Sequence, residues 1–350
     1  MARFGGAALA LAAALLFGLS TPAAKLLVGR IEPWMLAGLL YFASGIALGL
    51  IWLTGRLAGF FTATAIRGAD WRWLAGAIVA GGIAGPVLLT LGLVRTEAAT
   101  ASLLLNLEGV LTAVIAWVVF RENVDRRIAL GMATIVAGAL ALAWQGGPLL
   151  SDIAGPALIA GAGLAWAIDN NFTRQVSHGS PLVIAMLKGL VAGPINIGIG
   201  LWLGGLWPGG LDLVAVSAVG VLGYGVSLMF FVLALRAVGT ARTGAYFATA
   251  PFVGAAVAVG LLGEPLTWQL AIAGALMAAG VWLHLTERHE HDHGHEPLTH
   301  THRHRHDDGH HDHDHLPGQV TARAHSHPHT HARLVHRHPH FPDLHHRHRH

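Results

Sequence analysis

Long apolar runs separated by short polar segments fill the chain up to about residue 288. A helix needs about 20 mostly apolar residues to cross a bilayer, and it satisfies its backbone hydrogen bonds internally. Ten runs meet this requirement, at residues 5–28, 33–54, 72–93, 98–120, 127–145, 153–173, 181–203, 212–235, 243–263 and 268–285. The pattern therefore predicts an all-α integral membrane protein with ten transmembrane helices.

Lysine and arginine in the loops predict the orientation of these helices. With the N-terminus inside, most loop cations fall on the inner side, and only Lys25, Arg30 and Arg95 fall on the outer side. Cytoplasmic loops carry an excess of Lys and Arg, so this arrangement is favoured. We therefore expect a multi-pass protein of the inner membrane with both termini in the cytoplasm.

The fourth and ninth runs resemble each other. "TASLLLNLEGVLTAVIAWVVFRENV" (100–124) aligns without gaps on "RTGAYFATAPFVGAAVAVGLLGEPL" (242–266), which places Glu122 on Glu264. The alignment indicates that one half of the apolar part repeats the other.

The starts of the two halves also align, with "FGLSTPAAK" (17–25) on "WAIDNNFTR" (166–174). Each half holds five predicted spans, and an odd number reverses the second half in the membrane. Inverted repeats of this kind are typical of secondary transporters, whose binding site lies near the midplane between the halves. We assign residues 1–145 to the first repeat and 146–288 to the second.

Several stretches together carry a family resemblance. They are "FGLSTPAAK" in the first run, an "AxxASLLxxLE" pattern in the fourth, "ALRAVGTARTGAYFATAPF" across the eighth and ninth, and the glutamate that closes each repeat. They resemble the EamA-type drug/metabolite transporter superfamily over about residues 5–285. The resemblance implies a 5+5 carrier in which spans 1–4 and 6–9 line a central cavity. Gly109 departs from the pattern, because Pro commonly follows "LE".

Three ionisable residues stand out away from the ends of predicted spans, namely Glu108, Asp169 and Lys188. A charge at mid-membrane is costly, so it usually faces a cavity or a partner. Glu108 is our preferred coupling residue, because a cavity carboxylate can take up and release a proton during alternating access. Asp169, with Asn170 and Asn171, offers a polar cluster for a substrate or cation. Lys188 either binds an anionic substrate group or neutralises Asp169 or Glu108, and a purely structural ion pair is the alternative.

Other residues within the spans are candidates for cavity lining or gating. Aromatic residues with a polar tip, which either line the cavity or pack, are Trp166, Tyr224 and Tyr246. Prolines that kink a span, and act either as hinges or as static kinks, are Pro22, Pro86, Pro194 and Pro251. Lys25, near a span end, is expected to extend to the interface. Glu122 and Glu264, also at span ends, are expected to cap a following segment.

Residues 289–350 form a histidine-rich tail with almost no large apolar side chains, so we expect it to be disordered. Imidazole suits zinc, nickel, copper and cobalt, and a tract of this composition is a metal-binding signal. The predicted ligands are His289, His291, His293, His295, His300, His302, His304, His306, His310, His311, His313 and His315.

The sequence predicts a secondary-active carrier that exports a small solute such as a metabolite, amino acid or drug-like compound, with proton linkage. It needs the lipid bilayer and no cofactor, and spans 5 and 10 offer faces for a homodimer. One alternative is a nickel, cobalt or zinc efflux carrier, and another is a membrane metal sensor or scaffold with a vestigial carrier domain. We do not expect an enzyme or a nucleic-acid-binding protein, because catalytic motifs, phosphate loops and basic–aromatic patches are missing and cysteine is absent.

Overall fold

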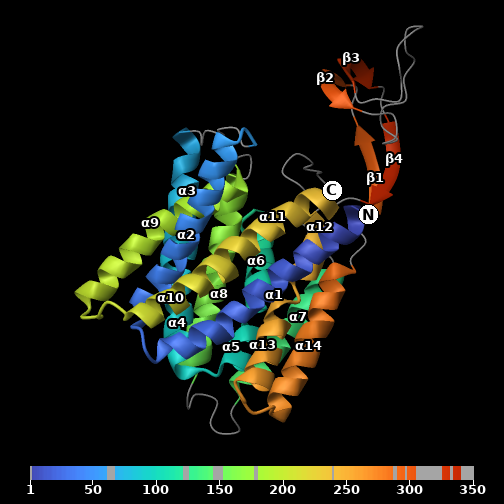
Figure 1. The fold of residues 1–350 in the computed structure, drawn as a ribbon. Helices are drawn as coiled ribbons and strands as arrows, with labels where there is room; N and C mark the ends of the chain where they lie inside the picture. The colour runs from blue at the N-terminus through green and yellow to red at the C-terminus, as the bar shows by residue number, and fades with distance from the viewer. Residues whose placement is uncertain are drawn as a thin grey trace. The chain divides into compact units, whose positions relative to one another are not determined.

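The computed structural model describes residues 2–60, 68–120, 126–144, 153–176, 180–238, 240–286, 290–295, 298–304, 325–331 and 334–339 (Figure 1). The chain divides into two compact units, Met1–Thr286 and Glu287–His350. The first, which we call the helical unit, contains every described helix. The second, the tail unit, contains the described strands.

Helices occupy all ten predicted ranges within the described residues. The long uninterrupted ones are α1 (Ala2–Val28), α2 (Pro33–Leu57), α7 (Arg126–Ala143), α8 (Ala154–Gln175), α9 (Pro181–Trp202) and α14 (Trp268–Leu285). The remaining ranges hold interrupted helices: η1–α3–η2–α4 (Gly68–Asp70, Trp71–Ala77, Ile78–Ala84, Gly85–Arg95), α5–α6 (Ala98–Leu104, Leu107–Val118), α10–η3–α11 (Gly210–Val219, Gly220–Val226, Ser227–Val238) and α12–α13 (Thr240–Phe247, Ala250–Leu261).

Eight helical spans among the described residues are long and apolar enough to cross a membrane. The other two ranges hold α8 and α14. α8 is long enough but carries Asp169, Asn170, Asn171 and Arg174, and the apolar stretch of α14, Trp268–His284, is one residue shorter than the shortest of the eight. A multi-pass helical protein is therefore established, and the full count of ten spans stays a prediction.

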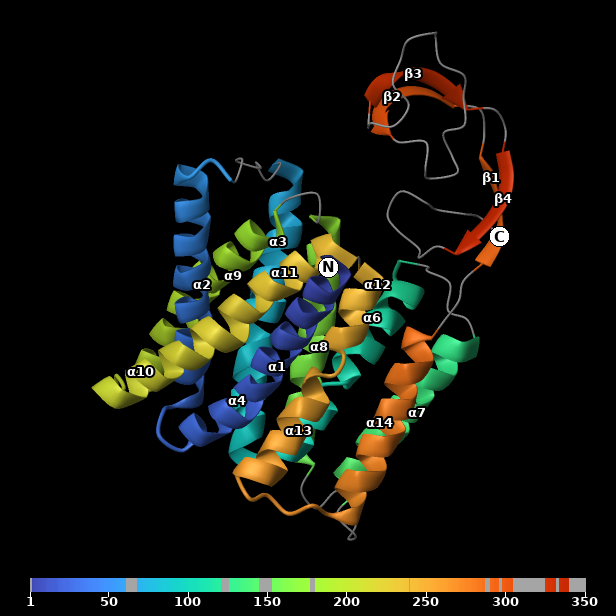
Figure 2. The ribbon, with the colours of Figure 1, turned by 45° about the vertical axis from the view of Figure 1, so that its right-hand side comes forward.

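Helices from the two halves pack against each other across the unit (Figure 2). α2 has its most extensive contact with α9, α7 with α14, and α1 with α11. Small residues allow the close approach of α2 and α9: a Cβ on Gly45 would lie 2.6 Å from the Leu190 nitrogen, and one on Gly189 would lie 2.6 Å from the Tyr41 oxygen. Glycine contacts of this kind are typical of helix packing in membranes, where backbones approach closely.

Two spans contain a π-helical segment at related positions. The segments η2 and η3 are separated by the same offset in numbering that pairs Glu122 with Glu264. The spans α5–α6 and α12–α13 are likewise both broken, at turns around Asn106 and Ala248. The frame of the sequence repeat thus also relates the irregular backbone of the two halves, and irregular helices at membrane depth commonly mark functional sites.

The described residues of the tail unit form two pairs of strands, and the disorder expected for the tail stays a prediction. β1 (Glu290–His295) pairs antiparallel with β4 (Leu334–Pro339), and β2 (Leu298–His304) pairs antiparallel with β3 (His325–His331). The prediction rested on the lack of apolar residues for a core. The alternation of histidine with other residues has period two, which suits an extended strand.

Candidate functional site

The third span widens into η2 just before Pro86. Proline has no N–H group, so Pro86 cannot donate to the carbonyl of Gly82 four residues back. The helix adapts by a longer bond, in which the Gly85 N–H donates to the Ala80 carbonyl. The carbonyls of Gly81 and Gly82 consequently accept hydrogen bonds from side chains of other helices.

Those donors come from three helices. On α2, the Tyr41 hydroxyl donates to the Gly81 oxygen at 2.8 Å. The Trp166 Nε1–H of α8 donates to the same oxygen at 3.0 Å, and the Asn196 amide of α9 donates to the Gly82 oxygen at 3.1 Å. Trp166 is only 7% exposed. Its indole therefore fixes η2 to α8.

Asp169 and Lys188 form a buried ion pair. The Lys188 Nζ lies 2.5 Å from Oδ2 and 2.7 Å from Oδ1 of Asp169, and the Thr173 hydroxyl donates to Oδ1 at 2.9 Å. The exposed fractions of the two side chains are 6% and 16%. A buried charge needs a partner that also satisfies its hydrogen bonds, and each residue supplies this for the other. Of the roles considered for Lys188, the geometry gives neutralisation of Asp169.

Gly81 lies directly against this ion pair. A Cβ at Gly81 would overlap the carboxylate of Asp169. The missing side chain is what lets η2 and α8 approach, so the π segment and the buried carboxylate form one structure.

Glu108 lies in the first turn of α6, just after the break that separates α5 from α6. The Asn170 amide donates to its Oε1 at 2.8 Å and also lies 3.3 Å from the Thr112 hydroxyl. Glu108 is partly exposed and Asn170 is exposed, although α8 packs against α3, η2, α4, α5 and α6. Within the described residues, Glu108 has no basic partner in salt-bridge range. This carboxyl is therefore partly exposed, and its partner is the neutral amide of Asn170 rather than a cation.

Asn171 has a different role from Asn170. Its amide donates to the Ala167 oxygen at 2.9 Å and lies 3.3 Å from the Thr112 oxygen, and the residue is buried. Asn171 therefore ties α8 to α6. We call the remaining group the α8 cluster and define it as Glu108, Thr112, Asp169, Asn170 and Lys188.

A row of partly exposed aromatic rings connects with the α8 cluster through Tyr41. Tyr41 packs on Tyr224 of η3 with ring centroids 5.7 Å apart, and Tyr224 packs on Phe17 of α1 at 5.9 Å. Phe17 contacts Phe247 of α12 at 5.3 Å, and Phe247 contacts Phe231 of α11 at 4.9 Å. We call these five residues the aromatic row. It offers an apolar surface next to polar groups.

The other sequence candidates are placed as follows. Tyr246 is partly exposed on α12, outside the aromatic row. Pro86 follows η2, and Pro251 lies in the first turn of α13, after the break in its span. Pro22 and Pro194 lie inside the uninterrupted helices α1 and α9. Two of the four prolines thus accompany irregular backbone.

The predicted metal ligands divide between described and undescribed residues. His291, His293 and His295 lie in β1, and His300, His302 and His304 lie in β2. The rest of the predicted set lies outside the described residues: His289, His306, His310, His311, His313 and His315. Glu122 also lies outside them.

Sequence reasoning missed Tyr41, Thr112, Asn196 and Phe17. None is charged, so none stood out against an apolar span. The "GG" followed by Pro in the third span was an available signal, because glycines before a proline free carbonyls that need donors elsewhere. Which residues supply those donors depends on the packing of helices distant in sequence.

The charged residues near α8 thus lie among irregular helices, in a unit with eight described helices long and apolar enough to cross a membrane. The chain matches the EamA-like transporter family over residues 4–144 and again over 153–286, and it belongs to that family. It is therefore a multi-pass membrane protein of a small-solute transporter family, which points to transport rather than to enzymatic activity.

Two individual proteins are similar to this chain. An uncharacterized transporter from Methanothermobacter thermautotrophicus is 27% identical over 297 residues, which are 81% of this chain and 87% of that protein. A solved structure, described only as the crystal structure of a protein, superposes with a TM-score of 0.60 at 19% identity over 80% of this chain and 95% of that chain. At that identity the likeness shows the fold alone.

Proposed function

We propose that the protein is a secondary-active exporter of a small solute and that Glu108 couples transport to protons. The observation that carries the proposal is the setting of Glu108. It is a partly exposed carboxyl without a basic partner among the described residues, placed where the span α5–α6 is broken. Broken spans near the middle of the membrane are where transporters bind substrates and coupling ions.

The two carboxyls near α8 have different roles in this proposal. Asp169 is held by Lys188 and Thr173, so its charge is already balanced. Within the part of the chain that the structure describes, Glu108 accepts from the neutral amide of Asn170, which can bond either a protonated or an ionised carboxyl. A group that must change its charge during alternating access is better placed at Glu108 than at Asp169.

The surroundings favour an amphipathic solute. Asn170, Thr112 and Glu108 offer polar contacts, while the aromatic row supplies partly exposed apolar surface. The Tyr41 hydroxyl links them, because it bonds to Gly81, which lies against Asp169, while its ring packs on Tyr224. Amino acids with apolar side chains, similar metabolites and drug-like amines or acids fit this combination.

The test is transport by full-length protein in proteoliposomes, with a panel of labelled amphipathic solutes and an imposed proton gradient. Glu108→Gln should lower proton-driven movement at least about tenfold, a barrier increase of about 1.4 kcal/mol, while solute exchange without a gradient persists. The control is Glu32→Gln, because Glu32 caps α2 through the Met35 N–H and a glutamine oxygen can replace that bond. Equal proton-driven movement in both variants would reject coupling at Glu108.

We further propose that both termini are cytoplasmic and that the membrane is the inner membrane. The distribution of loop cations supports this orientation. The chain has no cysteine, so single cysteines introduced at Gly59 and Gly204 report on opposite sides without background. An impermeant thiol reagent added to intact cells should label the cysteine at 204 and spare the one at 59. The reverse labelling pattern would show that the protein has the opposite orientation in the membrane.

For the tail, we propose binding of zinc, nickel, cobalt or copper. The backbone register supports this, since His300 is paired with His329, His302 with His327 and His304 with His325. Histidines opposite each other on neighbouring strands lie close together. Full-length protein should bind several equivalents of metal at pH 7.5 and lose them below about pH 6, where imidazole protonates. A protein ending at residue 288 should bind far less.

A second experiment distinguishes metal bound by the tail from a transported metal. Cell metal content is measured with full-length protein, with residues 1–288 and with full-length Glu108→Gln. Unchanged content in all three supports an organic solute. A change in one metal that Glu108→Gln abolishes would make that metal the cargo.

A further inference from the structure

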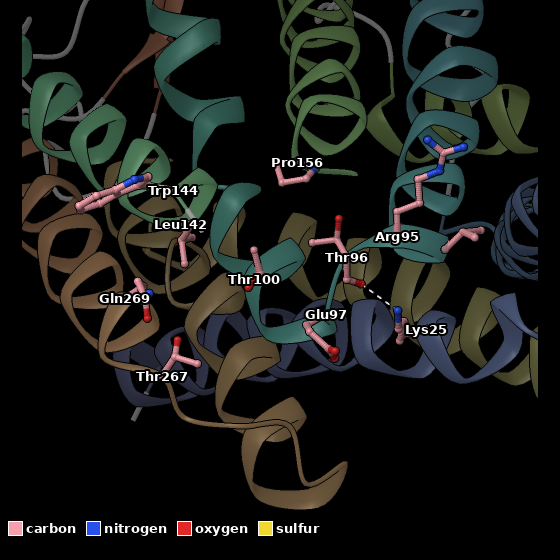
Figure 3. Close-up of a pocket in the computed structure, with 11 residues that line it drawn as sticks. Lys25, Arg95, Thr96, Glu97, Thr100, Leu142, Trp144, Pro156, Thr267 and Gln269 are labelled. Atoms are coloured by element: carbon pink, nitrogen blue, oxygen red, sulfur yellow. Dashed lines mark hydrogen bonds between the residues drawn. The ribbon is translucent and has the colours of Figure 1, made fainter. Parts of the chain in front are cut away.

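A pocket of about 520 Å³ lies where α4 gives way to α5, apart from the α8 cluster (Figure 3). Pockets of this size accommodate small molecules. The lining residues come from both halves of the chain and include Lys25, Arg95, Glu97, Thr100, Trp144 and Gln269. None of the sequence candidates for solute binding lines this pocket.

Two charged groups at this junction are occupied by the backbone. The Lys25 Nζ donates to the Leu93 oxygen at 2.7 Å and to the Thr96 oxygen at 2.9 Å, so it caps the end of α4 rather than extending to the interface. The carboxylate of Glu264 accepts from the Ala98 and Ala99 N–H groups at 2.7 Å each. Glu264 was expected to cap a following segment, and it instead caps α5 in the other half of the chain.

Arg95 and Glu97 are the charged residues of the pocket wall that are exposed. Arg95 is exposed and makes no hydrogen bond or ion pair within the described part of the chain. Glu97 is exposed and faces the Glu264 carboxyl, with Lys25 also close by. A hydrogen bond with Glu264, together with partial burial, raises the pKa of Glu97 above its ordinary value. When Glu97 is protonated, the two cations leave the pocket positive.

The uncharged part of the wall suits hydroxyl groups. Thr100, Thr267 and Gln269 offer hydroxyls and an amide, and the half-exposed indole of Trp144 offers a flat apolar surface. The cationic groups suit a carboxylate, and the hydroxyls and the amide suit hydroxyl groups on the same small molecule. We propose that this pocket binds a small carboxylate carrying hydroxyl groups, with Arg95 at the carboxylate and Glu97 setting the pH range of binding.

The direction of the pH effect follows from charge. Below the raised pKa of Glu97 the carboxyl is neutral and does not oppose an anion. As pH rises through that pKa, Glu97 becomes negative in the same pocket as the bound carboxylate, and affinity falls. The charged groups close to Glu97 are Glu264 and Lys25, and Arg95 lines the same pocket.

Binding is measured directly on purified full-length protein, with labelled gluconate as the probe and sorbitol as a neutral probe of similar size. Gluconate should bind, and sorbitol should bind clearly less. Arg95→Gln should weaken gluconate three- to fivefold, about what an exposed ion pair provides, and Arg95→Lys should restore most of it. The control is Arg56→Gln, because Arg56 is exposed on α2 and stacks over Trp52.

Glu97→Gln should retain tight binding at high pH and remove the pH dependence. Equal binding of sorbitol and gluconate, or equal loss in the Arg95 and Arg56 variants, would overturn the proposal. The inference stands apart from proton-coupled export: Glu108→Gln should leave gluconate binding unchanged, whatever it does to transport.

Discussion

The two halves of the helical unit repeat a backbone contact and give it different chemistry. In one half, Gly81 of η2 lies against Asp169 of α8, which is paired with Lys188. In the other, Gly223 of η3 lies against Ser20 of α1, and a Cβ at Gly223 would come 2.7 Å from the Ser20 Cβ. The aligned stretches 17–25 and 166–174 place Ser20 on Asp169.

The two halves therefore share the close approach of a glycine and a neighbouring helix. The residue at that contact is charged in one half, where it is Asp169, and neutral in the other, where it is Ser20. The Ser20 hydroxyl donates to the Phe17 oxygen within its own helix at 2.6 Å, and as a neutral group it brings no charge that another residue must balance. Asp169 requires Lys188. The broken spans show the same contrast, because the first turn of α6 carries Glu108 while the aligned position in α13 is Ala250.

Removing one member of the ion pair should have the largest effect on stability. Lys188→Met leaves the Asp169 charge buried without its partner, which should cost about 3–5 kcal/mol of unfolding free energy. Ser20→Ala on the matching side removes one local hydrogen bond and should cost about 0.5–1.5 kcal/mol. Denaturant titration in micelles compares them. The double variant Asp169→Asn/Lys188→Met should recover much of the lost stability. A loss in Ser20→Ala as large as that in Lys188→Met would contradict the difference between the two halves.

Filling the contact at Gly81 should have the next largest effect. In Gly81→Ala the new methyl overlaps the Asp169 carboxylate, so α8 or η2 must shift, at about 1–3 kcal/mol. Gly109→Ala is the matched control, since a Cβ there has nothing within 4 Å. Thermal unfolding of the two variants measures the difference. Equal midpoints would mean that the π segment yields easily and does not fix the ion pair.

Substitution of Glu264, which joins the two halves, should lower the unfolding free energy less than the changes above. Glu264→Ala removes the acceptor for two N–H groups of α5 and should cost about 0.5–2 kcal/mol, the range for lost helix caps. Glu264→Gln keeps an oxygen acceptor and should lose only part of this. Denaturant titration of the two variants orders them, and an unchanged Glu264→Ala protein would show that the cap does not hold the halves together.

The smallest effect is the pH dependence that Glu97 adds to stability. Its folded pKa is raised by the hydrogen bond with Glu264, so its contribution is complete below the unfolded pKa of about 4.3. The contribution disappears as pH rises through the folded pKa. Melting temperature measured from pH 4 upward should fall slightly over this range, and Glu97→Gln should flatten the curve. A rise over the same range would contradict the sign.

The sequence by itself determined the class of fold and the charged part of the site. Apolar runs of membrane-spanning length fixed the helices, because a bilayer leaves few other ways to satisfy a backbone. Glu108, Asp169, Asn170 and Lys188 stood out since charge and amide groups are costly in such runs. The repeat alignment places Ser20 and Asp169 at equivalent positions, and in the structure each lies against a glycine of a π-helical segment.

The tertiary structure decided how those residues are used. Sequence left Lys188 with three possible partners, and the crossing of α8 with α9 gave it Asp169. It also decided that Tyr41 and Trp166 bond to the Gly81 carbonyl and that Glu264 caps α5 from the other half. These outcomes depend on which helices meet, and apolar patterns along a span do not specify the neighbour that a buried polar group will find.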